Sequence, residues 1–356
     1  MCIRDRLFVL LAWPLQMAIR GRITWQHTML DIPIVIYAGI LIFIFFLYSP
    51  DMGWAVEGIR VYLQYLLCYF IATNLLTQRH QLDVLLNGFI VVATFLAIIG
   101  IGQYILGVEM PASWVDQAEA GVRTRAFSLV TSPNILGSLL VLFIPLTLSK
   151  IIQHKGSHKK QLLFGISCLL MLICLAFTYS RGAWLALMGA MILYSFLYNP
   201  KLLLLLAVGG LAVLKFVPGI GSRLAYMFST AYIISSLRAG RLARWGTALD
   251  HLKENPWLGE GFGRFGGAVA ARRVPGSFYV DNFYLKTAVE CGIIGLLALL
   301  WLLLNVLRLG FSVLRATTDK ATKLIDVYKR QMLGIFPIKT AILLFTFLPP
   351  GLSDIE

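Results

Sequence analysis

Apolar runs separated by short polar turns make up most of the chain. A helix needs about 20 mostly apolar residues to cross a bilayer, and on that length the pattern predicts about ten spans. The predicted fold is therefore all-α, a polytopic transmembrane helical protein. The spans are expected near Leu7–Ile19, Leu30–Tyr48, Ile59–Leu76, Leu82–Leu106, Asn134–Leu148, Leu162–Thr178, Ala183–Tyr198, Leu202–Phe216, Phe283–Leu307 and Met332–Leu348.

The composition excludes two classes of protein. Hydrophobic residues make up 58% of the chain and charged residues 13%, whereas a soluble domain carries about 25% charged residues. Intrinsic disorder requires low hydrophobicity and is excluded as well. The 5 cysteines form no CxxC pair, so the sequence supports neither a zinc site nor a redox motif.

The excess of positive charge predicts an orientation. The formal net charge is +14, from 31 lysines and arginines against 17 acidic residues. If the spans alternate, the basic residues of the short connections all fall on one side, which the positive-inside rule makes cytoplasmic. The other side then carries three segments: the loop 107–129, the short turn 178–182 and one large extracytoplasmic loop, 217–282. The basic residues in question are Arg20, Arg22, Arg79, Lys150, Lys155, Lys159, Lys160, Lys201, Arg308, Arg315, Lys320 and Lys323.

Two short stretches interrupt the otherwise continuous membrane pattern. Residues 1–6 and 326–331 resemble translated adapter or assembly scars, and we exclude them from functional reasoning. Residues 7–325 are predicted to form one membrane domain. The apolar segment 332–356 follows the second scar and is set apart as a terminal span.

The large loop is rich in arginine, and two interpretations remain open. The arginines form a solvated face that meets anionic lipid headgroups, or they bind a phosphate or diphosphate, whose oxygens match the planar fork of guanidinium. Arg238, Arg241 and Arg244 recur every three residues and are predicted to form a stripe on a helix. The pattern predicts this helix over Gly240–Glu254, with Trp245, Leu249 and Leu252 on its apolar face.

Arg181 lies where one span ends and the next begins, within Tyr179–Trp184. A charge at such a place faces a cavity or a partner, or it extends to the membrane surface along its own aliphatic stem. Arg125 lies shortly before the span that opens at Asn134.

The end of the large loop carries Asp281 and Asn282. Either residue type is a favoured helix N-cap, so capping of the following span is one interpretation. The other is a carboxylate at the outer mouth of the membrane domain, facing the arginines. Lys286 and Glu290 follow at i,i+4 spacing and are expected to pair with each other. Gly261–Gly266 formally matches GxGxxG, but no strand precedes it, so a close-packed turn is expected.

Taken in order, these pieces resemble the O-antigen ligase and polymerase superfamily of multi-pass membrane proteins. The resemblance runs from about Arg60 to Leu307. Each piece alone is weakly specific, whereas their order, spacing and membrane placement together are fairly specific. The pieces are Arg123–Ser128 with Ser132–Asn134, Tyr179–Trp184, Arg244–Trp245 with Asn255–Gly261, and Asp281–Leu285 with Glu290–Gly295.

The resemblance implies a GT-C-like glycosyltransferase in the bacterial cytoplasmic membrane. Members take a glycan from undecaprenyl diphosphate on the outer face and pass it to an acceptor hydroxyl on lipid A core, on a growing glycan or on a protein. They need neither a metal nor a nucleotide. The implied partners are the lipid-linked glycan, a glycan or lipid acceptor and membrane lipid, with no nucleic acid.

The resemblance also implies roles for individual residues. The diphosphate would be held by Arg181 together with Arg241 or Arg244. Arg125 is also included among the predicted diphosphate-binding residues. Asn282, Ser180 and Asn134 are assigned supporting roles. Many relatives carry His where this chain has Asp281, and a carboxylate can accept the acceptor's proton if it lies within hydrogen-bond reach. Asp281 is therefore the expected base of an inverting transfer, and His251 is a second candidate.

Alternatives to this function remain open. The Asp281 departure favours a polymerase of a surface or exopolysaccharide over a lipid A ligase. Some relatives are labelled as bicarbonate transporters, and a basic outer mouth also suits an anion transporter. However, the sequence shows no internal repeat and no pair of broken helices. A third interpretation is a structural role in envelope assembly, with the arginines binding anionic lipid.

Overall fold

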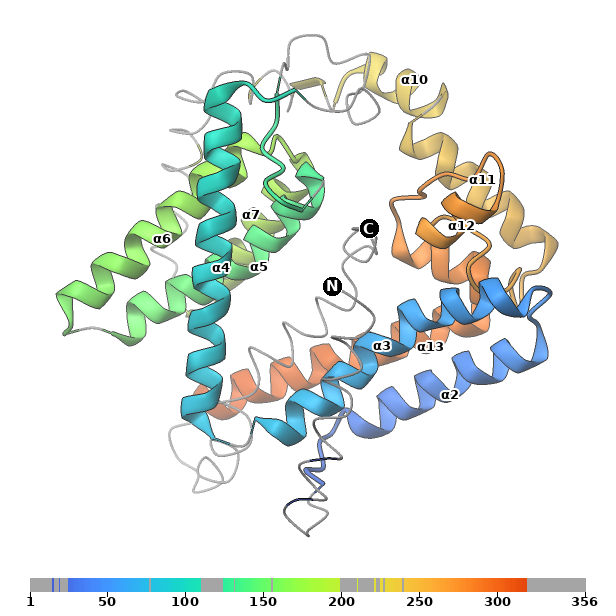
Figure 1. Ribbon diagram of the computed structural model, residues 1–356, viewed down its shortest axis with the longest axis horizontal. Helices are drawn as coiled ribbons and strands as arrows, with labels where there is room; N and C mark the ends of the chain where they lie inside the picture. The colour runs from blue at the N-terminus through green and yellow to red at the C-terminus, as the bar shows by residue number, and fades with distance from the viewer. Residues whose placement is uncertain are drawn as a thin grey trace. The chain divides into compact units, whose positions relative to one another are not determined.

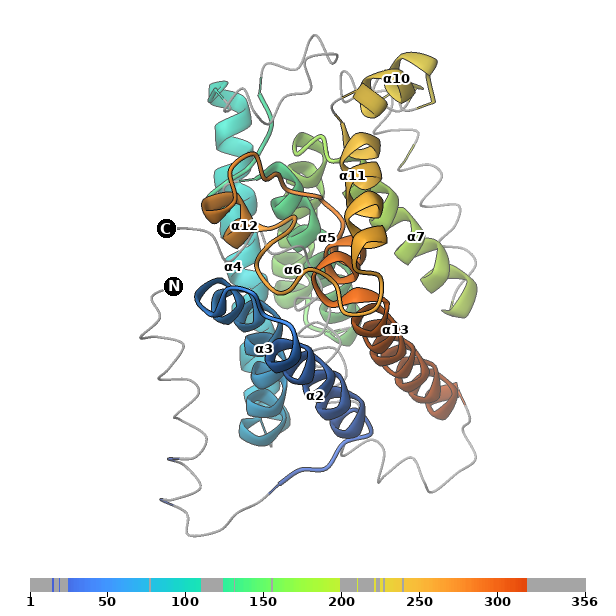
Figure 2. The ribbon, with the colours of Figure 1, turned by 90° about the vertical axis from the view of Figure 1, so that its right-hand side faces the viewer.

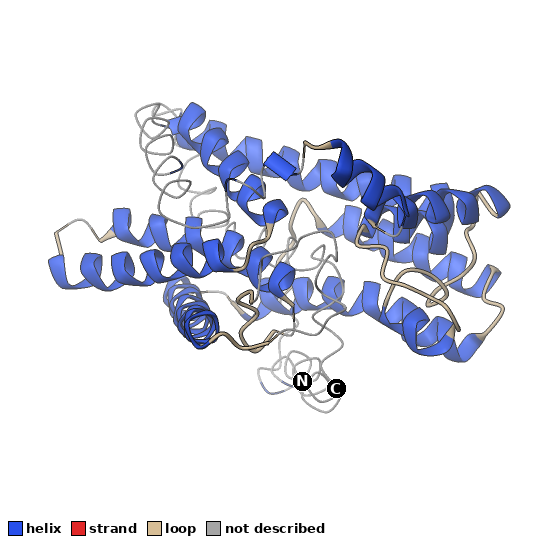
Figure 3. Ribbon diagram, turned by 90° about the horizontal axis from the view of Figure 1, so that it is seen from above, coloured by secondary structure: helices blue, strands red, loops and turns tan. Residues whose placement is uncertain are grey.

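The computed structural model describes residues 25–76, 78–109, 124–130, 132–154, 156–198, 225–226, 228–238 and 240–318, and single positions at 15, 19, 210 and 221. Within these ranges all regular structure is helical and no strand occurs (Figure 3), as the apolar pattern predicts. The chain divides into two compact units. Of the described residues, one unit holds those up to Val84 and those from Gly240 onward, and the other holds those within Leu85–Arg238.

The first unit is built around three helices: α2 (Asp31–Leu47), α3 (Met52–Leu75) and α13 (Phe283–Thr318). α2 and α3 form a hairpin, and α2 also packs along α13 (Figures 1 and 2), although more than 200 residues separate them. Two helices of the large loop complete the unit, α11 (Arg241–Glu254) and α12 (Ala268–Arg273). α11 contacts α13, and α12 contacts α3.

The large loop contributes to the hydrophobic core of this unit. Phe262 is 1% exposed and packs with Leu41, Ile44 and Tyr62. Its ring lies edge-on to Tyr62, with centroids 5.6 Å apart. An aromatic ring removed from water is a large source of stability. The segment between α11 and α12 is therefore anchored to the membrane helices.

The second unit contains α4 (Arg79–Leu106) beyond its first turn, α5 (Pro133–Gln153), α6 (His158–Phe177), α7 (Arg181–Tyr198) and α10 (Thr230–Arg238). α5 and α6 form an antiparallel hairpin (Figure 1), and α7 packs on α5. Pro133 opens α5, where its missing N–H is not needed. A Cβ on Gly137 would lie 2.9 Å from the Ala183 Cβ, so this glycine permits the close approach of α5 and α7.

Seven of the predicted spans coincide with described helices. Among the described residues, five helices are long and apolar enough to cross a membrane: Met52–Leu75, His80–Leu106, Pro133–Gln153, His158–Phe177 and Phe283–Ser312. The apolar stretches Asp31–Leu47 and Arg181–Ile192 are shorter. The predicted spans near 7–19, 202–216 and 332–348 lie outside the described residues apart from the single positions 15, 19 and 210, and both suspected scars lie outside them as well. The count of about ten stays a prediction.

α13 is interrupted at Gly292, which has φ 68° and ψ −174°. A Cβ there would overlap the carbonyl of Trp257, because the segment after α11 runs directly against the break. The amide of Ile293 donates to the Pro256 carbonyl at 2.8 Å instead of continuing the helix. Non-helical backbone within a membrane segment is tolerated where protein covers it.

We expect Gly292→Ala to destabilise the protein by more than ~3 kcal/mol, since it combines a left-handed backbone with a steric overlap. Gly165→Ala in α6 is the matched control, because a Cβ at Gly165 meets nothing within 4 Å. The thermal stability of each variant is measured as the loss of folded protein on heating in detergent. Equal thermal stability of the two variants would contradict this description of the break.

Candidate functional site

An arginine–aspartate cluster lies where the large loop ends and α13 begins. Arg244 on α11 donates from Nη1 to the Asp281 carboxylate at 3.2 Å and to the Tyr279 carbonyl at 3.2 Å. Arg241 Nε lies 3.9 Å from the same Asp281 oxygen. The side chains of Arg244 and Asp281 are 37% and 41% exposed. The cluster therefore offers two guanidinium groups and a carboxylate to a ligand.

The packed face of α11 fixes the position of the helix that carries the two arginines. The helix begins at Arg241, one residue later than the predicted Gly240, and it places Arg241 and Arg244 one turn apart. Ala248 is buried with Val280 and Val289, and Trp245 and Leu252 pack against this cluster. The Trp245 indole also donates to the Val280 carbonyl at 3.2 Å, which fixes α11 next to Asp281. The predicted apolar face is confirmed for Trp245 and Leu252, whereas Leu249 is 48% exposed.

Asp281 and Asn282 divide the two roles that the sequence left open. Asn282 caps α13, because its side-chain oxygen accepts the amides of Tyr284 at 3.1 Å and Leu285 at 3.2 Å. Asp281 has a left-handed backbone with φ 52°, which is uncommon for a residue other than glycine. Its carboxylate faces the arginines, as the second interpretation predicted.

The prediction that three arginines form a stripe on one helix is wrong for Arg238. Arg238 is the last residue of α10, whereas Arg241 is the first of α11. Gly240 between the helices has an extended conformation and breaks the helical spacing. Arg238 therefore does not share a helix with Arg241 and Arg244.

Other arginines of the large loop are paired with carboxylates of α3 and its N-cap. Arg264 lies 3.3 Å from Asp51, and Glu57 accepts Arg273 at 2.9 Å and lies 3.8 Å from Arg272. The sequence analysis did not identify these pairs, because more than 200 residues separate the partners. They give part of the basic loop a structural role.

A histidine and two glutamates gather at the end of α11. His251 Nδ1 lies 2.6 Å from a Glu260 oxygen, and the ligand atoms of His251, Glu254 and Glu260 lie within 4.8 Å of one another. This group has the donor types of a metal site, but Glu254 is exposed and the direct His251–Glu260 contact already satisfies that pair. We assign it no role in the chemistry.

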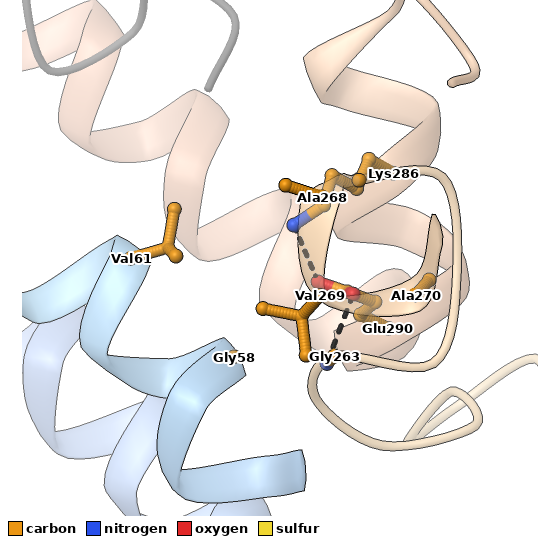
Figure 4. Close-up of a pocket in the computed structure, with 9 residues that line it drawn as sticks. Gly58, Val61, Gly263, Ala268, Val269, Ala270, Lys286 and Glu290 are labelled. Carbon is orange, nitrogen blue, oxygen red and sulfur yellow. Dashed lines mark hydrogen bonds and ion pairs between the residues drawn. The ribbon is translucent and has the colours of Figure 1, made fainter. Parts of the chain in front are cut away.

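Lys286 and Glu290 are paired, as the i,i+4 spacing predicted, with Lys286 Nζ 2.8 Å from Glu290. Glu290 is 0% exposed and also accepts the Tyr62 hydroxyl at 2.7 Å and the Gly263 amide at 3.0 Å. Figure 4 shows Lys286, Glu290 and Gly263 around a small cavity that is also lined by Gly58 and Ala268. Tyr62 could not be identified from the sequence, because no local spacing relates it to Glu290. The glycine-rich turn is close-packed, as predicted.

Arg181 begins α7 in the second unit. Its guanidinium lies 5.1 Å from the ring centre of Tyr232 and 6.0 Å from that of Tyr226, within range of cation–π attraction. Arg181 therefore faces a partner, which is one of the two predicted alternatives.

The turn before Arg181 is rigidly built. Tyr179 has a left-handed backbone with φ 50°, and its hydroxyl lies 3.0 Å from that of Tyr104. Burial, together with this hydrogen bond, raises the pKa of the Tyr179 hydroxyl well above its usual range. The Ser180 carbonyl accepts the Trp184 amide at 3.1 Å and so starts α7.

Arg125 is buried and bonded within the fold. It donates to the Thr178 carbonyl at 2.8 Å and to the Asn134 side chain at 3.2 Å. It thereby joins the start of α5 to the turn that precedes Arg181. These contacts are those of a structural residue, and diphosphate binding by Arg125 stays a prediction.

A comparison with protein families shows what part of this chain is similar to. Residues 166–300 match the family model described as O-antigen ligase. The matched segment contains Arg181, both arginines of α11, Asp281 and the buried Glu290. It gives no support to the transporter alternative. No curated protein matches the chain. The apolar helices indicate a multi-pass membrane protein, and the family match supports the assignment of this chain to the O-antigen ligase and polymerase superfamily.

Proposed function

We propose that this protein transfers or polymerises a glycan from undecaprenyl diphosphate on the outer face of the bacterial cytoplasmic membrane. The observation that carries the proposal is the cluster of Arg241, Arg244 and Asp281, in which the carboxylate and two guanidinium groups meet at partly exposed positions. A glycosyl transfer from a lipid diphosphate needs both functions. Cations bind the leaving diphosphate, and a base takes the proton of the acceptor hydroxyl.

The proposed reaction is an inverting transfer without a metal. Asp281 accepts the proton of the acceptor hydroxyl while the oxygen attacks the anomeric carbon. The bond from that carbon to the diphosphate breaks, and the diphosphate leaves with the electron pair. Arg241 and Arg244 stabilise the negative charge that builds on its oxygens, as preorganised cations do for leaving phosphates. An attack opposite the leaving group inverts the anomeric centre.

We propose Arg181 as a further diphosphate-binding residue. Its own surroundings support this role, because it opens a helix and two tyrosine rings hold its guanidinium. Arg125, Asn134 and Ser180 are proposed to fix the turn that presents it. Asn282 is proposed to support Asp281 by ending the loop and starting α13.

We propose a polymerase of a surface or exopolysaccharide rather than a lipid A ligase. The motive is Asp281, which stands where many relatives carry His. A product linked to lipid A core would contradict this choice.

The function is tested by complementation. The gene is introduced into a strain that lacks its surface glycan polymerase, and the glycan is analysed as a ladder on a gel. We expect the wild-type gene to restore long chains and Arg181→Ala to remove them, at equal protein level in the membrane. Arg181→Glu tests the alternative of a structural role in envelope assembly. Normal chain length in that charge-reversal variant would contradict a role of Arg181 in diphosphate binding.

A further inference from the structure

The buried charges of α13 form a network that is more elaborate than a helix-stabilising pair. Glu290 accepts from three groups: Lys286 of its own helix, Tyr62 of α3 and the backbone amide of Gly263. Lys286 Nζ also lies 4.7 Å from the centre of the Tyr62 ring. Removing both charges from water is costly, and apolar residues of the same volume often replace such a pair without loss of stability. The network therefore calls for a role besides stability.

The network contacts the glycine-rich segment at two points. At the first, Glu290 accepts the Gly263 amide at 3.0 Å (Figure 4). At the second, Gly267 faces the stem of Lys286 so closely that a Cβ there would lie 2.6 Å from Lys286 Cε. Gly58 of α3 allows the glycine-rich segment to pack directly against the helix, because a Cβ at Gly58 would overlap the backbone of Gly263.

Between these two points the segment supports the residue before Asp281. The Gly266 carbonyl accepts the Val280 amide at 3.4 Å, and a Cβ on Gly266 would lie 2.9 Å from Val280 Cγ1. The Val280 carbonyl in turn accepts the Trp245 indole of α11. Asp281 follows with its left-handed backbone, a conformation that persists only where the surroundings determine it.

We propose that Lys286 and Glu290 are positioning residues for the reaction: they clamp Gly263 and Gly267, and the clamped segment sets the place of Val280 and Asp281. This inference rests on the proposed role of Asp281. Neither residue is assigned a contact with substrate. Their effect passes through the loop backbone.

Two double variants separate positioning from stability. The Gln variant combines Lys286→Met with Glu290→Gln, and its side-chain amide oxygen can still accept the Gly263 N–H. The Leu variant combines Lys286→Met with Glu290→Leu, and its side chain cannot accept that N–H. Neither variant buries an unpaired charge. Thr287→Val is the control for disturbance of the same helix turn, because the buried Thr287 hydroxyl donates to the Phe283 carbonyl within α13 and to no other group of the described residues. Each purified protein is assayed in vesicles that contain the lipid diphosphate donor.

The Leu variant is expected to lose at least about tenfold in kcat per folded protein, with KM for the donor changed by less than about threefold, since small misplacement of a reacting group costs rate. The Gln variant and Thr287→Val are expected to keep kcat within about threefold of wild type. In hydrogen exchange, the amide of Val280 is expected to exchange at least about tenfold faster in the Leu variant only.

Equal kcat and equal Val280 exchange in the two double variants would overturn the proposal. A Leu variant with a lower amount of folded protein but an unchanged kcat per folded protein would overturn it as well. If the Leu variant does not fold, Gly267→Ala provides the test, because the added methyl presses on Lys286 while the backbone stays extended at φ −144°. It should lower kcat at least about threefold without raising KM, and an unchanged kcat would overturn the inference. If the wild-type protein shows no transfer activity, only the proposed function is contradicted. The hydrogen exchange of Val280 still tests whether Lys286 and Glu290 hold the glycine-rich segment in place.

Discussion

Asp281→Asn is expected to abolish glycan assembly without lowering the amount of protein in the membrane. Loss of a positioned general base costs about 10²- to 10⁴-fold in rate, and Asn has no basic oxygen of comparable strength. The fold should be retained, because the Asp281 side chain is 41% exposed and, among the described residues, pairs with the two arginines of α11. Asn also tolerates the left-handed backbone that position 281 requires.

The same variant should bind the diphosphate more tightly than wild type. In the described arrangement the Asp281 carboxylate occupies Arg244 at 3.2 Å, where a diphosphate oxygen would otherwise bind. A partly exposed ion pair is worth ~0.5–1 kcal/mol, so its removal should improve the affinity about two- to fivefold. Binding is measured with a non-transferable lipid diphosphate in vesicles.

Asp250→Asn is the matched control for this experiment. Asp250 lies on α11, the helix of Arg241 and Arg244, but it pairs with Lys253 at 2.8 Å, and the hydrogen bond from Lys253 lowers the pKa of its carboxyl group. This variant should leave both binding and transfer unchanged. Weaker binding by Asp281→Asn would show that Asp281 orients the arginines rather than competes for them. Normal glycan in that variant would contradict its role as the base.

Arg244→Ala is expected to lower kcat by about 10²- to 10³-fold, the usual cost of removing one preorganised group that stabilises a developing charge. Arg244→Lys should restore little of this loss. The guanidinium of Arg244 reaches the Tyr279 carbonyl and the Asp281 carboxylate at the same time, whereas an ammonium group lacks the planar fork. Transfer per folded protein, measured with purified protein in vesicles, checks both variants.

Arg273→Ala serves as the control for loss of a positive charge from the same loop. Its guanidinium is bound to Glu57 of α3 at 2.9 Å and is 48% exposed. An exposed pair of this kind contributes ~1 kcal/mol or less to stability. We expect transfer by Arg273→Ala to remain within about twofold of wild type. Equal losses in Arg244→Ala and Arg273→Ala would instead indicate that the loop acts through its total charge.

The parts of this structure that depend on local sequence could be predicted. Apolar run length located the described membrane helices, and the spacing of apolar residues located α11 after Gly240. The i,i+4 rule paired Lys286 with Glu290. The cap of α13 by Asn282 also follows from residue type, because a short side-chain oxygen next to a helix start satisfies its free amides.

The contacts that complete the site could not be predicted, because they join distant parts of the chain. Nothing in the local pattern relates Tyr62 to Glu290 or Glu57 to Arg273. The stripe of arginines failed at Arg238 because periodicity alone does not reveal that Gly240 leaves the helical conformation. The burial of Arg125 was missed for a related reason, since its partner is a backbone carbonyl at Thr178.

The central claim is that the cluster of Arg241, Arg244 and Asp281 performs glycosyl transfer from a lipid diphosphate. It is tested most directly with purified full-length protein in vesicles that contain undecaprenyl diphosphate carrying a labelled glycan, in the presence of a chelator. The account predicts glycan chains that lengthen as undecaprenyl diphosphate is released in equal amounts, by wild type and not by Asp281→Asn or Arg244→Ala. Release and lengthening that persist in both variants would contradict it.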